Sequence, residues 1–265
     1  MSKRLDVYLA DSGICKSRQK AQEQIKSGNI FVNGSCVIKP SFSVDEQMTV
    51  ENRGESLKYV SRGGLKLEKA IESFDIRLLG LVCADIGAST GGFTDCMLQN
   101  GAKKVYAVDV GTDQLADILK KDSRVVNLEK TNFRNITENE IIEPLDFASV
   151  DVSFISLKII LPKLFTLLKD ESYACCLIKP QFEAGRENIG KNGVVKDRKI
   201  HEKVIDEIRG YALSIGFSVM ALDYSPIKGP QGNIEYLILL KKGGELCDKC
   251  CTRTKDLVAN SHSKL

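Results

Sequence analysis

The sequence lacks any long apolar run, since no stretch approaches the ~18 apolar residues that a membrane-spanning helix needs. Its N-terminus, MSKRLDVYLADSG, also lacks the apolar core of a signal peptide. We therefore expect a cytoplasmic protein without stable membrane insertion. The composition, 43% hydrophobic and 28% charged over 265 residues, is typical of a soluble globular protein with one large or two modest domains.

Ordered cysteine spacing is lacking as well. The nine cysteines are scattered, which favours free thiols in a reducing compartment over a disulfide framework. The C-x-x-C of Cys247 and Cys250 has no second ligand pair, so we expect no metal site, with zinc there as the weaker alternative. The surrounding segment has no apolar periodicity, and residues 243–265 are predicted to form a disordered tail.

A strong excess of one charge is also missing, because 38 Lys and Arg face 35 Asp and Glu. The distribution of charge is more informative than this balance. Residues 1–40 hold three acids against seven basic residues, which are Lys3, Arg4, Lys16, Arg18, Lys20, Lys26 and Lys39. A basic face beside a helix N-terminus suits phosphate, although a generic cluster of this kind is more often a solvated surface.

The most informative stretch is CADIGASTGG at residues 83–92. An apolar run leads to Asp85, and three glycines then allow a sharp turn and close approach to a ligand, because glycine has no Cβ to clash. Strand, turn and helix in this order open a nucleotide-cofactor site, but the spacing is neither G-x-G-x-x-G nor Walker A. Alone, the stretch also fits an ordinary tight turn. Asp109, at the end of the next apolar run, favours a cofactor with ribose hydroxyls.

Strand-like and helical segments alternate through the rest of the chain. Strands are expected at residues 81–86, 104–109, 124–128, 147–151, 173–179, 217–224 and 234–240. Helices are expected at residues 65–74, 93–98, 113–121, 156–168 and 199–215. The pattern predicts a parallel sheet with helices on both faces, and residues 225–233 are too few for a crossover helix, so the last strand should be antiparallel. Such a seven-stranded, doubly wound α/β sheet resembles the class I (Rossmann-like) methyltransferases.

Ionisable side chains gather at the carboxyl edge of this expected sheet, where ligands bind. They are Asp85, Asp109, Asp151, Lys179, Glu235 at the start of the antiparallel strand, and Lys66 from the helix before the first strand. Two lysines and two acids would then converge beside the cofactor. The acids fit two roles: plain ion pairs with the lysines, or catalysis, because isolated ionisable groups at a ligand edge are enriched in function.

The N-terminal segment predicts a small α+β domain. Two short helices, the second capped by Ser17, precede strands at residues 30–32, 37–38 and 48–50, with an Asn33-Gly34 hairpin turn between the first two. The pattern RLDVYLADSGICKSRQKAQEQIKSGNIFVNG resembles the αL-motif RNA-binding domain of the ribosomal protein S4 kind. This resemblance implies contacts with structured RNA, by shape and phosphate recognition, at Arg4, Lys16, Ser17, Arg18 and Lys20.

The remaining motifs resemble one family over residues 3–242. YVSRGGLKL, ADIGASTGGFTD, VYAVDVG, DVSFISL, LIKPQFEAGRENIGKNGVVKD and SPIKGPQGNIEYL occur in the order of the TlyA family, rRNA 2′-O-methyltransferases also known as hemolysin A, whose catalytic domain is FtsJ/RrmJ-like. The resemblance implies methylation of a ribose, of a cytidine in 16S or 23S rRNA or both, within ribosomal subunits. It places the catalytic tetrad on Lys66, Asp151, Lys179 and Glu235.

The same resemblance implies S-adenosylmethionine as the cofactor. The glycine-rich turn would hold it, with Asp109 on its ribose. The expected contacts are Asp85, Gly87, Ala88, Ser89, Gly91, Gly92, Asp109, Val110 and Asn132. The expected domains are residues 1–51 for RNA binding and 59–242 for catalysis, with a linker at 52–58.

The chemistry accounts for these residue types. A ribose hydroxyl is a poor acid, so a lysine must be neutral to accept its proton. Burial and the adjacent cation Lys66 favour the neutral amine at Lys179, which is our hypothesis for the base or proton relay. The two acids oppose this, so their expected role is to orient the lysines and the hydroxyl.

A glycine-rich segment, residues 181–197, is interpreted as a mobile loop beside the tetrad. Lys191, Lys196 and Arg198 either hold substrate phosphates there or belong to plain surface. Two other functions remain open for the whole chain: a hemolysin or cytolysin that acts on membranes, and a noncatalytic RNA-binding protein that keeps the fold. The absence of a long amphipathic basic helix argues against the first, and the intact tetrad argues against the second.

Overall fold

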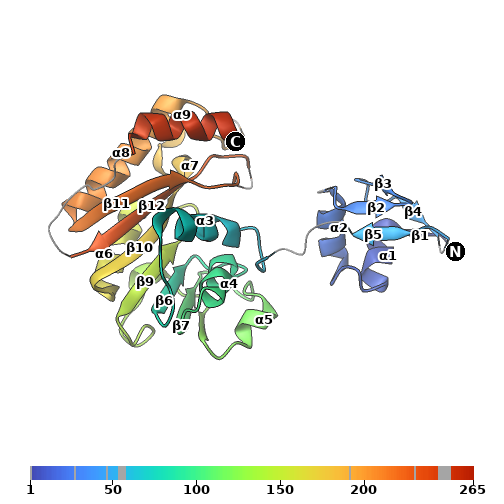
Figure 1. Cartoon of the computed structure of the whole chain (residues 1–265), viewed down its shortest axis with the longest axis horizontal. Coiled ribbons are helices and arrows are strands. Elements are labelled where there is room, and N and C mark those ends of the chain that lie inside the picture. The colour runs from blue at the N-terminus through green and yellow to red at the C-terminus, as the bar shows by residue number, and fades with distance from the viewer. Residues whose placement is uncertain are drawn as a thin grey trace. The chain divides into compact units, whose positions relative to one another are not determined.

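The computed structural model (Figure 1) describes residues 2–26, 28–45, 47–52, 58–190, 192–229, 231–243 and 252–265. The chain divides into two compact units, Met1–Lys58 and Tyr59–Leu265. Most of the predicted linker lies outside the described residues, as do Lys191 and the C-x-x-C of Cys247 and Cys250.

The first unit packs two helices against short strands. The helices are α1 (Leu5–Asp11) and α2 (Arg18–Lys26). One sheet has the order β3-β2-β5, and β1 pairs with β4; the strands are β1 (Lys3–Arg4), β2 (Ile30–Val32), β3 (Ser35–Cys36), β4 (Ser43–Val44) and β5 (Val50–Asn52). Apolar residues of both helices and of β2 form its core, including Leu5, Leu9, Ala21, Ile25 and Ile30.

The Asn33-Gly34 hairpin turn is confirmed, but the predicted strand at residues 37–38 is wrong. Both turn residues have positive φ, 47° and 78°, which suits a two-residue hairpin turn. The strand after it is only Ser35–Cys36. The backbone carbonyl of Phe42 then accepts a hydrogen bond from the Leu5 amide at 2.7 Å, so the chain turns towards the start of α1 and leaves Ile38 67% exposed.

The second unit contains a seven-stranded sheet of order β11-β12-β10-β9-β6-β7-β8. Every pair is parallel except the two that β12 makes with β10 and β11, which confirms the predicted fold class. The strands are β6 (Val82–Ile86), β7 (Lys104–Val108), β8 (Val125–Leu128), β9 (Leu145–Val150), β10 (Leu168–Ile178), β11 (Phe217–Tyr224) and β12 (Tyr236–Lys242).

Helices cover both faces of this sheet (Figure 1). Apolar side chains on one face pack with α3 (Gly64–Phe74), α4 (Gly92–Gln99) and α5 (Asp117–Lys120). Those on the other face pack with α6 (Leu157–Leu167), α8 (Arg198–Ser214) and α9 (Thr254–Lys264). Shorter helices are η1 (Phe133–Asn135), α7 (Pro180–Glu183) and η2 (Arg186–Asn188).

The prediction of a disordered tail is wrong for residues 254–264, which form α9. Its buried residues recur at helical spacing, but two of the four are hydroxylic rather than apolar, namely Thr254 and Ser261. The Thr254 hydroxyl donates to Asp206 at 2.6 Å and accepts from Arg209 at 3.0 Å, both on α8. Because these contacts are polar, an apolar pattern could not reveal the packing of this helix.

Candidate active site at the carboxyl edge of the sheet

The four residues of the predicted tetrad lie together. Asp151 and Lys179 directly follow β9 and β10, and Glu235 precedes the antiparallel β12, so all three lie at one edge of the sheet. Lys66 of α3 reaches the same edge, with Nζ 2.6 Å from Glu235 Oε2 and 3.3 Å from Asp151 Oδ2. Lys179 Nζ lies 2.5 Å from Asp151 Oδ1, so Asp151 contacts both lysines.

Three members of the tetrad are buried, Asp151 is 17% exposed, and the charges of the four balance. The side chains of Lys66 and Lys179 are 8% and 9% exposed, and that of Glu235 is 1% exposed. Burial lowers the pKa of Lys66, but the carboxylates of Asp151 and Glu235 outweigh it and raise that pKa above its ordinary value. Burial likewise raises the pKa of Asp151, but the two lysines outweigh it, so this pKa lies below its usual range. The ion pairs expected in the simpler interpretation are therefore present.

A cavity of about 240 Å³ distinguishes the site from a plain ion-pair cluster. Lys66, Asp151 and Lys179 line it. The glycine-rich turn lines it as well, through Asp85, Gly87, Ala88, Ser89, Thr90 and Gly92. The charged groups therefore face the part of the chain that the sequence assigns to a cofactor.

The glycines permit close backbone contacts. A Cβ at Gly87, where φ is +87°, would lie 2.5 Å from the carbonyl oxygen of Asp151. A Cβ at Gly92 would lie 2.3 Å from Ser61 Oγ. Gly91 differs from the other two, because it does not line this cavity. It packs against Leu119 of α5 instead, and a Cβ at Gly91 would lie 2.3 Å from the Leu119 side chain.

Asp85 anchors the helix that follows the turn. Its carboxylate is 1% exposed and accepts hydrogen bonds from the Thr94 amide (2.8 Å) and hydroxyl (2.7 Å) and from the Ser149 hydroxyl (3.3 Å). Burial raises the pKa of Asp85 to about 7 despite these donors. Asp85 lines the cavity but also holds the first turn of α4 in place.

Asp109 shapes a second, adjoining cavity of about 360 Å³. Its carboxylate accepts from the amides of Ser89 and Gly111, each at 2.7 Å, so it holds the glycine-rich turn to the end of β7. Val110 and Asn132, two of the residues expected to contact the cofactor, line this cavity. Gly87, Ser89, Asp151 and Ser153 line both cavities.

Several residues of this edge were missed at the sequence level. Phe154 is 88% exposed with a φ of +63°, and its ring lies 5.0 Å from that of Phe182. Ser153 accepts a hydrogen bond from Lys179 Nζ at 3.2 Å. Glu183 of α7 accepts from the Ser156 hydroxyl (2.6 Å) and the Leu157 amide (2.8 Å) at the start of α6. Their sequence signals were their proximity to Asp151 and Lys179 along the chain and their place within the DVSFISL and LIKPQFEAGRENIGKNGVVKD motifs.

Two of the five predicted RNA contacts of the first unit, Arg4 and Arg18, form ion pairs with the buried Asp6. Arg4 Nε and Arg18 Nε each lie 3.0 Å from its carboxylate, and Gln22 donates to it at 2.8 Å. The Arg4 guanidinium is the main cause that holds the pKa of Asp6 well below its usual range. The side chains of Arg4 and Arg18 stay about half exposed, 49% and 56%.

The other three predicted contacts lie at or near the start of α2. Ser17 accepts from the Lys20 amide at 3.2 Å and so caps the helix, as the sequence predicts. Lys16 is exposed, and Lys20 forms an ion pair with Glu23 at 2.8 Å. All five predicted side chains therefore reach the surface of this unit.

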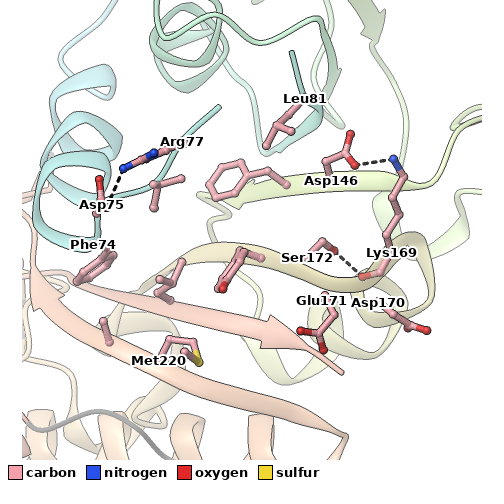
Figure 2. Close-up of a pocket in the computed structure, with 15 residues that line it drawn as sticks. Phe74, Asp75, Arg77, Leu81, Asp146, Lys169, Asp170, Glu171, Ser172 and Met220 are labelled. Carbon is pink, nitrogen blue, oxygen red and sulfur yellow. Dashed lines mark hydrogen bonds and ion pairs between the residues drawn. The ribbon is translucent and has the colours of Figure 1, made fainter. Parts of the chain in front are cut away.

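A more spacious cavity, about 610 Å³, lies at the opposite edge of the sheet (Figure 2). Its floor is apolar, and the charged residues of its rim form ion pairs, Asp146 with Lys169 at 2.5 Å and Asp75 with Arg77 at 3.7 Å within the rim, and Asp170 and Glu171 with Lys242 and Lys241 outside it. Buried ionisable groups distinguish the smaller tetrad cavity, so chemistry and not size selects the candidate site.

Two further searches covered the described residues. No group of three or more His, Cys, Asp or Glu side chains among them could hold a metal ion. No helix in the same ranges is long and apolar enough to cross a membrane.

Known rRNA methyltransferases are similar to this chain over most of its length. The chain is 48% identical over 243 residues to YqxC of Bacillus subtilis (strain 168), named as an rRNA methyltransferase, covering 91% of this chain and 86% of that protein. It is 40% identical over 240 residues to the 16S/23S rRNA (cytidine-2′-O)-methyltransferase TlyA of Mycobacterium tuberculosis (strain CDC 1551 / Oshkosh), covering 90% and 89%. A solved Streptococcus thermophilus structure that carries the hemolysin name matches with a TM-score of 0.81 and 46% identity, covering 99% of this chain and 96% of that one. The S4 domain model matches residues 3–50 and the FtsJ-like methyltransferase model residues 59–242, so the chain belongs to the FtsJ-like methyltransferases of the TlyA type.

Proposed function

We propose that this protein transfers a methyl group from S-adenosylmethionine to a ribose 2′-hydroxyl of ribosomal RNA. The observation that carries the proposal is the Lys66–Asp151–Lys179–Glu235 cluster, three members of which line one cavity together with the glycine-rich turn, while the buried Glu235 contacts Lys66. The TlyA relative is named for cytidine-2′-O methylation of 16S and 23S rRNA. A cytidine in one or both of these RNAs, within ribosomal subunits in the cytoplasm, is therefore the proposed target.

The two adjoining cavities fit the proposed cofactor. Gly87 leaves space where a Cβ would meet the Asp151 carbonyl, and Asp109 retains acceptor capacity for ribose hydroxyls beyond its two amide donors. Val110 and Asn132 would border the adenine. When bound, S-adenosylmethionine supplies a methyl group already activated by its sulfonium sulfur. The residues of the chain then have to orient the hydroxyl and accept its proton.

Lys179 is the better of the two lysines for that proton. Lys66 lies between two carboxylates, which hold it in the charged form. Among the described residues, Lys179 forms an ion pair with the single carboxylate of Asp151 and donates to the neutral hydroxyl of Ser153. Lys179 therefore has one acidic neighbour where Lys66 has two, which makes it the proposed acceptor of the proton. Lys66 and Glu235 would then hold Asp151 and the entering ribose in position.

The substrate would be held by both units. In the first, Arg4 and Arg18 offer a fixed pair of guanidinium groups to phosphates. In the second, Lys196 and Arg198 are exposed near the end of the glycine-rich segment and can contact the backbone. Phe154 offers an exposed ring on which a nucleobase can stack.

The proposal is tested by methyl transfer from labelled S-adenosylmethionine to ribosomal subunits that lack the modification, with the target mapped by mass spectrometry. Lys179→Ala should reduce kcat by at least about 100-fold, the usual range for loss of a general base, while cofactor binding measured by calorimetry stays intact. Exposed Lys203→Ala on α8 is the matched control and should keep full activity. Full activity of Lys179→Ala, or no ribose methylation by the wild type, would contradict the proposal.

A further inference from the structure

Ser153 is the second polar partner of the Lys179 amine. Lys179 Nζ lies 2.5 Å from Asp151 Oδ1 and donates to Ser153 Oγ at 3.2 Å. The Ser153 side chain is itself exposed, and the residue lines both the tetrad cavity and the adjoining cofactor cavity. Lys179 is only 9% exposed, so its amine has few directions open to it.

The geometry of an amine explains why a second acceptor matters. A neutral lysine has two N–H bonds and one lone pair in a tetrahedral arrangement. Ser153 accepts one N–H, and Asp151 Oδ1, which has no hydrogen-bond partner among the described residues, lies 2.5 Å away as the acceptor for the other. When both N–H bonds are held in this way, the lone pair points in the remaining direction. Lys179 lines the tetrad cavity, so this direction can face a bound ribose. With one acceptor alone, either N–H bond can face it, so the lone pair divides between two directions.

The nearest aromatic ring cannot replace Ser153 in this role. Phe182 lies with its ring centroid 5.8 Å from Lys179 Nζ, at the outer limit of a useful cation–π contact. Such a contact attracts the charged amine but does not bind a single N–H at a set angle. The serine hydroxyl does so, because a hydrogen bond weakens steeply as it bends.

We propose that Ser153 is a positioning residue that directs the Lys179 lone pair at the ribose 2′-hydroxyl. This inference rests on the proposed function. In the step it serves, the hydroxyl proton passes to the lone pair of Lys179, and the oxygen uses the electron pair of its O–H bond to bond to the methyl carbon. The carbon–sulfur bond breaks with its electron pair left on sulfur, so atoms and charge balance.

The test compares Ser153→Ala and Ser153→Thr with wild type in the full-length protein. Ser153→Ala should lower kcat about tenfold, because a hydrogen bond to a chargeable group is lost, while KM for ribosomal subunits stays within about twofold. Calorimetric binding of S-adenosylhomocysteine should not change. Ser153→Thr keeps a hydroxyl and should restore most of kcat. Ser123→Ala, in the exposed turn before β8, is the matched control.

The pH dependence of kcat separates positioning from a structural role. Removal of the acceptor destabilises the ammonium form of Lys179 more than the neutral amine, because charge-assisted hydrogen bonds are stronger. The acid limb of the profile should therefore move to lower pH in Ser153→Ala and return in Ser153→Thr. A purely structural defect lowers the whole profile without moving this limb.

Two outcomes would overturn the inference. One is a Ser153→Ala enzyme with wild-type kcat and an unmoved pH profile. The other is a change in KM alone, which would make Ser153 a substrate contact. If either occurs while Lys179→Ala is inactive, the proposed function stands and only the positioning role fails. An active Lys179→Ala enzyme would instead remove the function on which the inference rests.

Discussion

The carboxyl group of Asp85 provides a quantitative test of the electrostatics at the cofactor edge. It is almost fully buried, and its pKa is raised to about 7 by burial, although Thr94 and Ser149 donate hydrogen bonds to it. The native protein therefore keeps a proton on this group at mildly acidic pH, whereas the unfolded chain, with an ordinary pKa of ~3.9, has already lost it.

The sign and size of the effect follow from that difference. Because the folded pKa is raised, the native state binds more protons than the unfolded state between about pH 4 and pH 7, and the free energy of unfolding falls as pH rises. From pH 5 to pH 8 the loss is roughly 2.6 kcal/mol, close to two pKa units at about 1.36 kcal/mol each. An Asp85→Asn side chain can still accept from Thr94 and donate to Ser149 Oγ, but it does not titrate.

The assay is urea unfolding of wild type and Asp85→Asn at pH 5, 6, 7 and 8. Other titrating groups are common to both proteins and cancel in the difference. The variant should gain roughly 2–3 kcal/mol on wild type between pH 5 and pH 8. Parallel stability curves would refute the reasoning, because they would mean that the three hydrogen bonds keep the buried carboxylate ionised throughout.

Three further predictions concern the same edge. Gly87→Ala places a Cβ 2.5 Å from the Asp151 carbonyl at a φ of +87°. It should therefore destabilise the fold by at least about 1–3 kcal/mol in urea unfolding and weaken calorimetric binding of S-adenosylhomocysteine. Unchanged binding would contradict the placement of the cofactor beside Gly87. Phe154→Ala should raise KM for ribosomal subunits about tenfold through the loss of one stacking contact, whereas Phe154→Trp should not, and equal KM values would exclude stacking. Glu183→Ala leaves the Leu157 amide without its carboxylate acceptor and should lower the free energy of unfolding by about 1–3 kcal/mol in thermal unfolding. Glu183→Gln keeps an acceptor and should be close to wild type. A Gln variant as unstable as the Ala variant would show that charge and not hydrogen bonding matters.

Strand order made the tetrad cluster predictable. In a parallel sheet the strand ends meet at one edge whatever the side chains between them, so Asp151 and Lys179 could be placed from the apolar runs alone. The short connection before β12 reversed that strand and brought Glu235 to the same edge. Only the position of Lys66 needed more than topology, because α3 has to pack across the sheet to reach the other three.

Contacts between loops were not predictable in the same way. Phe154 has a φ of +63°, and Glu183 accepts a hydrogen bond from Ser156 at the start of α6. Both features depend on how α7 packs beside the loop after β9, and no local sequence pattern encodes that packing. The helix α9 escaped prediction for a related reason, since two of its four buried residues, Thr254 and Ser261, are hydroxylic and weaken the apolar pattern. Apolar periodicity identifies elements that bury carbon, but not those that bury satisfied hydrogen bonds.

The buried carboxylate of Asp6 also has a consequence for salt dependence. Arg4 and Arg18 share this one partner, so the three side chains together carry a net charge of +1 rather than the +2 that their guanidinium groups suggest. When this surface binds RNA, it would therefore release about one counterion fewer than two unpaired arginines would. A count of basic residues in the first unit therefore overstates how steeply its affinity for RNA should fall with ionic strength.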